Sequence, residues 1–164
     1  MRMMILTVAL AAALCSVPVR VSADAAADGR AVSDAFAKAV AAGDVPAIVA
    51  LYRDDASVIW PGQGEEAKGK AAIEALAKKL VAQKSGTIAL KSQDSKALGD
   101  DYIVNVGRWE NTITTPAGKT QTVVIRTSEV LQKTDGKWLY LVDHASIGLP
   151  PPAPSHGRRG RTRR

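Results

Sequence analysis

Cysteine is almost absent from this chain of 164 residues, which has one, Cys15. The residues around it are typical of a secretory leader, because a positively charged start and an apolar stretch from Ile5 to Leu14 precede small side chains at Val21 and Ala23. We expect residues 1–23 to be a signal peptide cleaved after Ala23, and the protein to be secreted or periplasmic. The exported chain then contains no disulfide, so its stability comes from its core alone.

Long hydrophobic runs are absent as well. The stretch from Ile5 to Leu14 is well short of the ~20 residues that span a bilayer, and Pro18 and Arg20 interrupt the residues after it. A membrane anchor is the alternative to a cleaved leader, and the short stretch disfavours it. A lipid-modified terminus is disfavoured too, because Leu14 precedes Cys15 where such signals carry a small residue.

Histidine is scarce, with two in the chain, His144 and His156. The exported chain has these two histidines and no cysteine, and no metal site is visible in its sequence. We expect no metal and no cofactor. Gly62-Gln63-Gly64 follows an expected strand but opens no helix at the spacing of a phosphate-binding loop. No serine stands on a recognisable nucleophile elbow, although counting residues does not exclude a Ser-His-Asp triad.

The folded part of the chain has no excess of either charge, although the whole sequence has 22 basic and 16 acidic residues and a net charge of +6. Between Asp24 and Pro154 there are 15 basic residues against all 16 acids, and five basic residues close the chain: Arg158, Arg159, Arg161, Arg163 and Arg164. A near-neutral domain lacks the clustered basic surface of a specific nucleic-acid-binding protein.

The last stretch, residues 150–164, is rich in proline and arginine, and we expect it to be a disordered tail. Its five arginines predict either a cationic arm for non-specific contact with anionic surfaces, or a solvated terminus without a partner.

Apolar residues recur at spacings of three and four in the first half of the chain, which indicates helices. Val32, Phe36 and Val40 mark an amphipathic helix from Asp24 to Ala42 that ends at Gly43.

A second, shorter helix is expected after Asp44, an N-cap residue, with Ile48, Leu51 and Tyr52 as its buried stripe. The pattern then predicts a short strand at Ala56–Trp60 and a third helix at Lys70–Ala82.

After Gln83 the apolar period becomes that of strands. Four long strands separated by turns are predicted: Ser85–Ala97, Asp101–Thr114, Lys119–Lys133 and Lys137–Ile147. Helices followed by an antiparallel meander is an α+β order, in which the helices pack on one face of the sheet. A parallel βαβ fold needs helices between the strands, and none fit there.

Several short motifs occur in an order that resembles one fold family. They are Gly43-Asp44, Leu51-Tyr52 before Asp54-Asp55-Ala56, Pro61-Gly62, Gly69-Lys70 with Ile73, and Gly136-Lys137-Trp138 leading to Asp143-His144-Ala145-Ser146. From Ala31 to Pro150 the chain resembles the SnoaL-like branch of the nuclear transport factor 2-like (ketosteroid isomerase-like) superfamily. The resemblance implies one α+β domain at residues 24–149, a cone-shaped curved antiparallel sheet with three N-terminal helices around a pocket.

Ketosteroid isomerase, which has a similar first half, takes the substrate proton with a carboxylate before the proline of the short strand, and polarises the carbonyl with a tyrosine in helix one. The same register puts Trp60 and Phe36 at those positions. Indole is not a base and phenyl has no hydroxyl, so this isomerisation is not expected here.

His144 is the candidate catalytic residue. Strict alternation along the last strand puts Trp138, Tyr140, Val142, His144 and Ser146 on one face and Leu139, Leu141, Asp143 and Ala145 on the other. If the first set faces the helices, His144 lies in the pocket, where an imidazole acts as a base or hydrogen-bond donor. The alternative is a histidine that braces the sheet through Ser146 or a neighbouring strand.

Three charged residues, Glu110, Arg126 and Asp143, interrupt otherwise apolar strands. In a pocket they would position a water or bind an anionic ligand, as in epoxide hydrolases of this fold; on the outer face Glu110 and Arg126 would form a cross-strand ion pair. The candidate ligand-binding residues are Tyr52, Trp60, Arg126, Tyr140 and Ser146.

Three functions fit the sequence. The first is an exported domain that binds a small apolar molecule in the cone. The second is a lyase, isomerase or cyclase with His144 as the base, and the third is a homodimeric interaction module without a ligand. The missing base and hydroxyl at Trp60 and Phe36 favour the first over the second.

Overall fold

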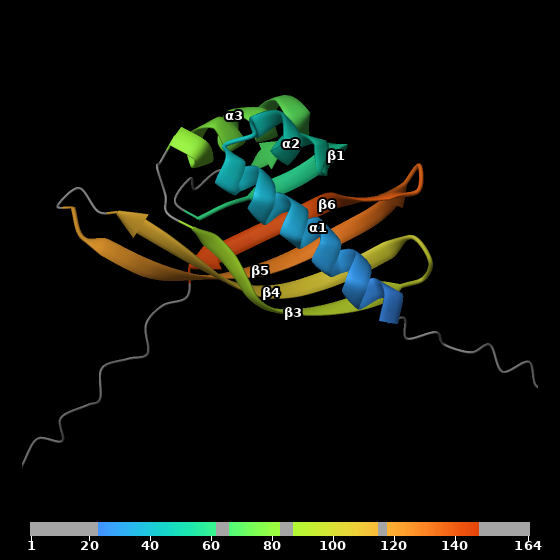
Figure 1. The fold of residues 1–164 in the computed structure, drawn as a ribbon. Coiled ribbons are helices and arrows are strands. Elements are labelled where there is room, and N and C mark those ends of the chain that lie inside the picture. The colour runs from blue at the N-terminus through green and yellow to red at the C-terminus, as the bar shows by residue number, and fades with distance from the viewer. Residues whose placement is uncertain (1–22, 62–65, 83–86, 115–117, 148–164) are drawn as a thin grey trace, which may run out of the picture.

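The computed structural model describes residues 23–61, 66–82, 87–114 and 118–147 (Figure 1). The elements in chain order are α1 (Ala23–Ala42), α2 (Val45–Ala50), β1 (Tyr52–Ile59), β2 (Ala67–Lys68), α3 (Gly69–Ala82), β3 (Ile88–Leu98), β4 (Tyr102–Thr114), β5 (Thr120–Thr134) and β6 (Lys137–Ile147). Apart from Ala23, the expected leader lies outside the described residues, as does the arginine-rich tail. Within the described ranges no helix is long and apolar enough to cross a membrane.

The strands form one open, curved sheet in the order β2-β1-β6-β5-β4-β3, and the three helices lie over one of its faces (Figure 1). β3 to β6 pair antiparallel with their neighbours in the chain, which confirms the predicted meander. The sheet is not wholly antiparallel, because β1 pairs parallel with β6. β2 was not predicted, since a two-residue strand carries no periodic signal.

α1 and its junction with α2 form as the sequence predicts. Val32 and Phe36 on the apolar stripe of α1 are buried against the core. The helix ends at Gly43, whose φ of 66° is a conformation that glycine adopts without strain. The carboxylate of Asp44 then caps α2 by accepting a hydrogen bond of 2.9 Å from the backbone N–H of Ala47.

The prediction that Tyr52 lies on the buried stripe of α2 is wrong. α2 ends at Ala50, and Tyr52 is the first residue of β1, where it pairs with Tyr140 of β6. The backbone N–H of Tyr140 donates a 2.8 Å hydrogen bond to the carbonyl of Leu51. Pairing with β6 therefore draws this segment into the sheet before the second turn of the helix is complete.

Aromatic side chains form the centre of the core between α1 and the sheet. The ring of Phe36 meets Trp60, Trp109 and Tyr140 edge-on, at centroid distances of 5.7, 6.2 and 6.4 Å. Tyr52 stacks on Tyr140 at 4.9 Å. These edge-to-face and stacked contacts add to the free energy gained by burying the rings.

Candidate functional site

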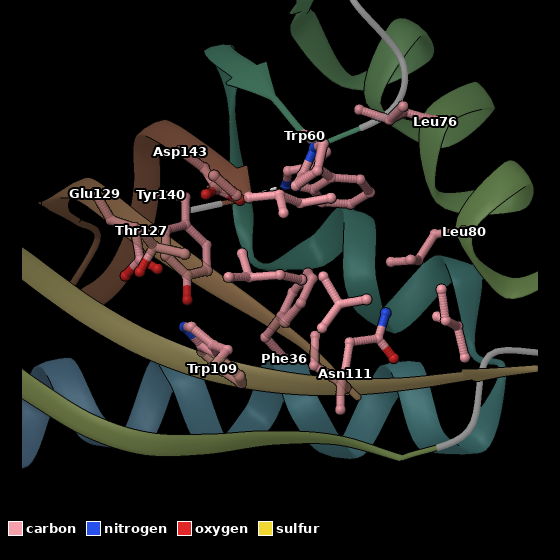
Figure 2. Close-up of a pocket in the computed structure, with 17 residues that line it drawn as sticks. Phe36, Trp60, Leu76, Leu80, Trp109, Asn111, Thr127, Glu129, Tyr140 and Asp143 are labelled. Atoms are coloured by element: carbon pink, nitrogen blue, oxygen red, sulfur yellow. Dashed lines mark hydrogen bonds between the residues drawn. The ribbon is translucent and has the colours of Figure 1, made fainter. Parts of the chain in front are cut away.

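A cavity of about 200 Å³ lies between the helices and the inner face of the sheet (Figure 2). Its wall is mainly apolar, with Phe36 from α1, Leu76 and Leu80 from α3, and aliphatic side chains from β4, β5 and β6: Ile113, Val123, Ile125, Ala145 and Ile147. In Figure 2 Asp143, Glu129 and Thr127 gather at one end of the cavity, away from Leu76 and Leu80. The cavity therefore has an apolar body and an acidic end.

A β-bulge decides which residues of β6 face the cavity. Leu131 of β5 pairs with Tyr140, but the next residue back, Val130, pairs with Val142, so Leu141 is an extra residue in β6. One extra residue reverses the inward and outward faces of a strand beyond it. Tyr140 and Asp143, three positions apart, are consequently both buried.

The bulge corrects the expected position of His144. Strict alternation put this residue in the pocket with Tyr140, whereas beyond Leu141 it is exposed on the outer face, opposite the exposed Ser128 of β5. Ser146 is exposed on the same outer face. Neither residue lines the cavity, and Asp143 takes the inward place beside His144.

Asp143 is buried and accepts two hydrogen bonds at the same carboxylate oxygen. The hydroxyl of Tyr52 and the indole Nε1–H of Trp60 each lie 2.7 Å from Oδ2. Burial raises the pKa of Asp143, and the hydrogen bonds from Trp60 and Tyr52 oppose this increase. Burial, and then the charge of Asp143, raises the pKa of Tyr52 above its usual value, so its hydroxyl stays protonated and donates.

Glu129 of β5 lies directly opposite Asp143 in the sheet register, and both side chains line the cavity. Asn105 donates a 3.2 Å hydrogen bond from Nδ2 to Oε2 of Glu129. Burial, followed by the nearby charge of Asp143, raises the pKa of Glu129 to about 7, against smaller lowering effects of Thr127 and Asn105. The charge of Asp143 therefore disfavours ionisation of Glu129.

The other predicted site residues separate into two groups. Trp60 and Tyr140 line the cavity, and Tyr52 lies behind them as the hydrogen-bond partner of Asp143. Arg126 is exposed on the outer face opposite Arg108 of β4, so of its two expected positions it takes the outer one and does not line the cavity.

Glu110 also faces outward, but the expected ion pair with Arg126 is replaced by others. Its carboxylate contacts Lys91 at 3.3 Å and Arg108 at 3.1 Å. The register explains this. Glu110 lies opposite Val124, whereas Arg126 lies opposite Arg108, two positions away from Glu110 along β4.

Some residues that line the cavity were not predicted from the sequence as site residues, among them Glu129, Thr127 and Trp109. A signal was present, because Val123, Ile125 and Leu131 alternate along β5, and Thr127 and Glu129 fall in phase with them. A carboxylate in phase with buried aliphatic residues predicts a buried acid. Among the described residues, no three His, Cys, Asp or Glu side chains lie close enough together to hold a metal ion.

Comparison with known proteins decides the family. Residues 30–150 match the SnoaL-like domain. The chain belongs to the SnoaL-like family. Trp60 and Phe36 both line the cavity of this SnoaL-like domain.

Solved structures share the nuclear transport factor 2-like fold. A ketosteroid isomerase-like protein from Erwinia carotovora atroseptica is 24% identical, with 76% of this chain and 96% of that chain covered and a TM-score of 0.67. A nuclear transport factor 2-like protein of unknown function from Pseudomonas putida is 22% identical, with coverage of 79% and 91% and a TM-score of 0.68.

A third structure, a nuclear transport factor 2-like protein with a cystatin-like fold from Novosphingobium aromaticivorans, is 18% identical, with coverage of 79% and 86% and a TM-score of 0.66. No curated protein matches the chain. At these identities the structures are similar to this chain in fold alone, because one fold carries many different chemistries.

Proposed function

We propose that this SnoaL-like domain binds a small, mostly apolar molecule in the cone between its helices and its sheet. The cavity with an apolar body and a buried acidic end carries this proposal. Ligand sites typically combine a mainly apolar wall with a few polar groups that fix orientation. Here the apolar groups come from both the helices and the sheet, and the polar ones at the acidic end are Thr127, Glu129 and Asp143.

The volume of the cavity sets the size of the ligand. A dry apolar cavity of about 150 Å³ takes benzene. The cavity of about 200 Å³ therefore suits a molecule with one ring, or one ring and a short substituent.

Filling the cavity tests the proposal. Ala145 lines it with a buried methyl group, whereas Ala89 on β3 is exposed. We expect toluene to bind the wild-type protein in an NMR titration, Ala145→Leu to weaken binding at least tenfold, and the matched control Ala89→Leu to leave it unchanged. Equal binding by the wild type and Ala145→Leu would place the ligand elsewhere, provided that circular dichroism shows both to be folded.

Acid–base catalysis is a second candidate function, and the Glu129 carboxyl favours it. A group with a pKa of about 7 is present in both protonation states near neutral pH, which suits a general acid or base. In this account Glu129, with Asp143 beside it, takes the catalytic role that the sequence assigned to His144. The reaction class is proton transfer at a carbon next to a carbonyl, as a lyase, isomerase or cyclase requires.

Exchange of carbon-bound hydrogen tests the second function without a known substrate. Cyclohexanone in D₂O exchanges its α-hydrogens slowly, and we expect the wild-type protein to accelerate this exchange above the rate in buffer. Glu129→Gln should abolish the acceleration and His144→Ala should retain it. A wild-type rate equal to that of buffer would exclude this candidate for small ketones.

The predicted homodimer stays a prediction, and apolar residues on the outer face of the sheet support it. Val106 of β4 and Val142 of β6 are 56% and 39% exposed there. Burying such residues is the usual reason for association through a sheet face. Light scattering of the wild type and of Val106→Lys tests it, with a dimer expected for the first and a monomer for the second.

A further inference from the structure

Three polar side chains on the cavity wall have an atom without a hydrogen-bond partner among the described residues: Trp109, Asn111 and Thr127. Asn111 lies away from the acidic end in Figure 2. The other two atoms are the indole Nε1–H of Trp109 on β4 and the hydroxyl oxygen Oγ1 of Thr127 on β5, which is near enough to Glu129 to lower its pKa but makes no hydrogen bond of ordinary geometry. Trp109 is 3% exposed and Thr127 is 7% exposed, and both side chains line the cavity. Since buried donors and acceptors are almost always paired, two open ones on a cavity wall indicate that a ligand group pairs with them.

Gly107 brings these two groups together. It lies opposite Thr127 in the register of β4 and β5, and a Cβ at this position would stand 2.5 Å from Oγ1 of Thr127 and 3.1 Å from Nε1 of Trp109. Gly107 is not among the residues with positive φ, so its backbone conformation does not require glycine. A side chain would collide with Thr127, so its absence lets both polar atoms lie close to the backbone of Gly107, near one point.

The two groups and their neighbours define the chemistry of the missing partner. An indole N–H only donates, so the partner must be a hydrogen-bond acceptor, which excludes an ammonium group. Thr127 and Glu129 lie on the same face of β5, with Asp143 beyond them on β6 (Figure 2). A carboxylate or phosphate on the ligand would meet the negative charge of this end of the cavity, and like charges in a buried site repel strongly.

We propose that Trp109 and Thr127 form a subsite for an uncharged oxygen atom, a hydroxyl or carbonyl group, on the apolar molecule that the cavity binds. This inference rests on the proposed binding function. A hydroxyl group accepts from Trp109 and donates to Thr127 or Glu129, and a carbonyl accepts from Trp109 and from the hydroxyl of Thr127.

Toluene, phenol and benzoate, titrated into the full-length protein at pH 7 and followed by NMR, test the subsite. The three share a ring and differ in the group that would reach Trp109. We expect Trp109→Phe, which removes the N–H and keeps an aromatic ring, to lower the preference for phenol over toluene about tenfold. That factor corresponds to about 1.4 kcal/mol. Thr127→Val, which replaces the hydroxyl with a methyl group, should lower the preference in the same direction, and benzoate should bind the wild type more weakly than phenol does.

Trp138→Phe is the matched control, because its indole Nε1–H donates to Asp28 at 2.8 Å and the residue does not line the cavity. It should leave the ratio of the two dissociation constants unchanged. Toluene and phenol binding with the same ratio in the wild type, Trp109→Phe and Thr127→Val would overturn the subsite while leaving the binding function standing. If neither toluene nor phenol binds the wild-type protein, both the subsite and the proposed binding function are overturned.

Discussion

Glu129 and Asp143 are direct partners across β5 and β6, and their carboxyl groups face the same cavity. Both are buried, and burial raises the pKa of each. Three protein donors serve the pair: Tyr52 and Trp60 hydrogen-bond Asp143, and Asn105 hydrogen-bonds Glu129. A sheet interior rarely holds two adjacent acids without a function, because each costs free energy to desolvate.

The raised pKa of Glu129 predicts how stability depends on pH. The folded-state pKa of about 7 lies above the ordinary value of 4.5, so the native state binds more protons between these values. The protonated Glu129 carboxyl therefore contributes about 2–4 kcal/mol to the free energy of unfolding. This contribution is fully present below pH 4.5 and is lost as the pH rises through 7. Glu129→Gln should remove most of this fall in the free energy of unfolding, measured by urea denaturation at pH 5 and pH 8.

Glu74→Gln provides the control, since Glu74 on α3 has a half-exposed side chain in an ion pair with Lys78. The free energy of unfolding of Glu74→Gln should fall between pH 5 and pH 8 as much as that of the wild type. A Glu129→Gln protein that loses as much stability as the wild type between pH 5 and pH 8 would show that Glu129 is already ionised at pH 5.

Adjacent residues of β6 should respond differently to truncation. Asp143→Ala leaves the hydroxyl of Tyr52 and the indole N–H of Trp60 buried without their acceptor, and should lower the free energy of unfolding by about 2–4 kcal/mol. His144→Ala, on the exposed outer face, should change it by less than about 0.5 kcal/mol. Urea denaturation at pH 7 measures both, and a larger loss for His144→Ala would contradict the bulge at Leu141.

Among the residues of α1, Phe36 should cause the largest loss of stability when its side chain is truncated. It is the only phenylalanine in the chain, is 8% exposed, and contacts three aromatic rings. Phe36→Ala should cost about 3–5 kcal/mol through lost transfer free energy and the space it leaves. A loss below ~1 kcal/mol would mean that α1 does not pack on the sheet as described. Val40→Ala, at a half-buried position of the same helix, should cost less.

The sequence predicted the long elements well and the local irregularities poorly. Periodic segments such as α3 and β6 begin and end within a few residues of the predicted bounds, because burial repeats along them. The bulge was invisible because Leu139, Leu141 and Val142 are all apolar, so both faces of the strand look alike until Asp143. One extra residue therefore exchanged the predicted pocket residue His144 for its neighbour.

The start of β1 was hidden for a related reason. Ile48, Leu51 and Tyr52 fit a helical stripe, and only the long-range pairing of Tyr52 with Tyr140 makes the last of them part of a strand. Glu129 differs, because its phase with Ile125 and Leu131 was readable from the sequence.

The indole N–H signals of the three tryptophans test the central claim, that the cavity next to Glu129 and Asp143 is the ligand site. Trp60 and Trp109 line the cavity, whereas Trp138 lies outside its lining and donates to Asp28. In a ¹H–¹⁵N spectrum of the full-length protein titrated with phenol, the signals of Trp60 and Trp109 should shift together with saturation while that of Trp138 stays in place. A saturating shift of Trp138 alone, or no shift of Trp60 and Trp109 at any phenol concentration that leaves the protein folded, would contradict the account.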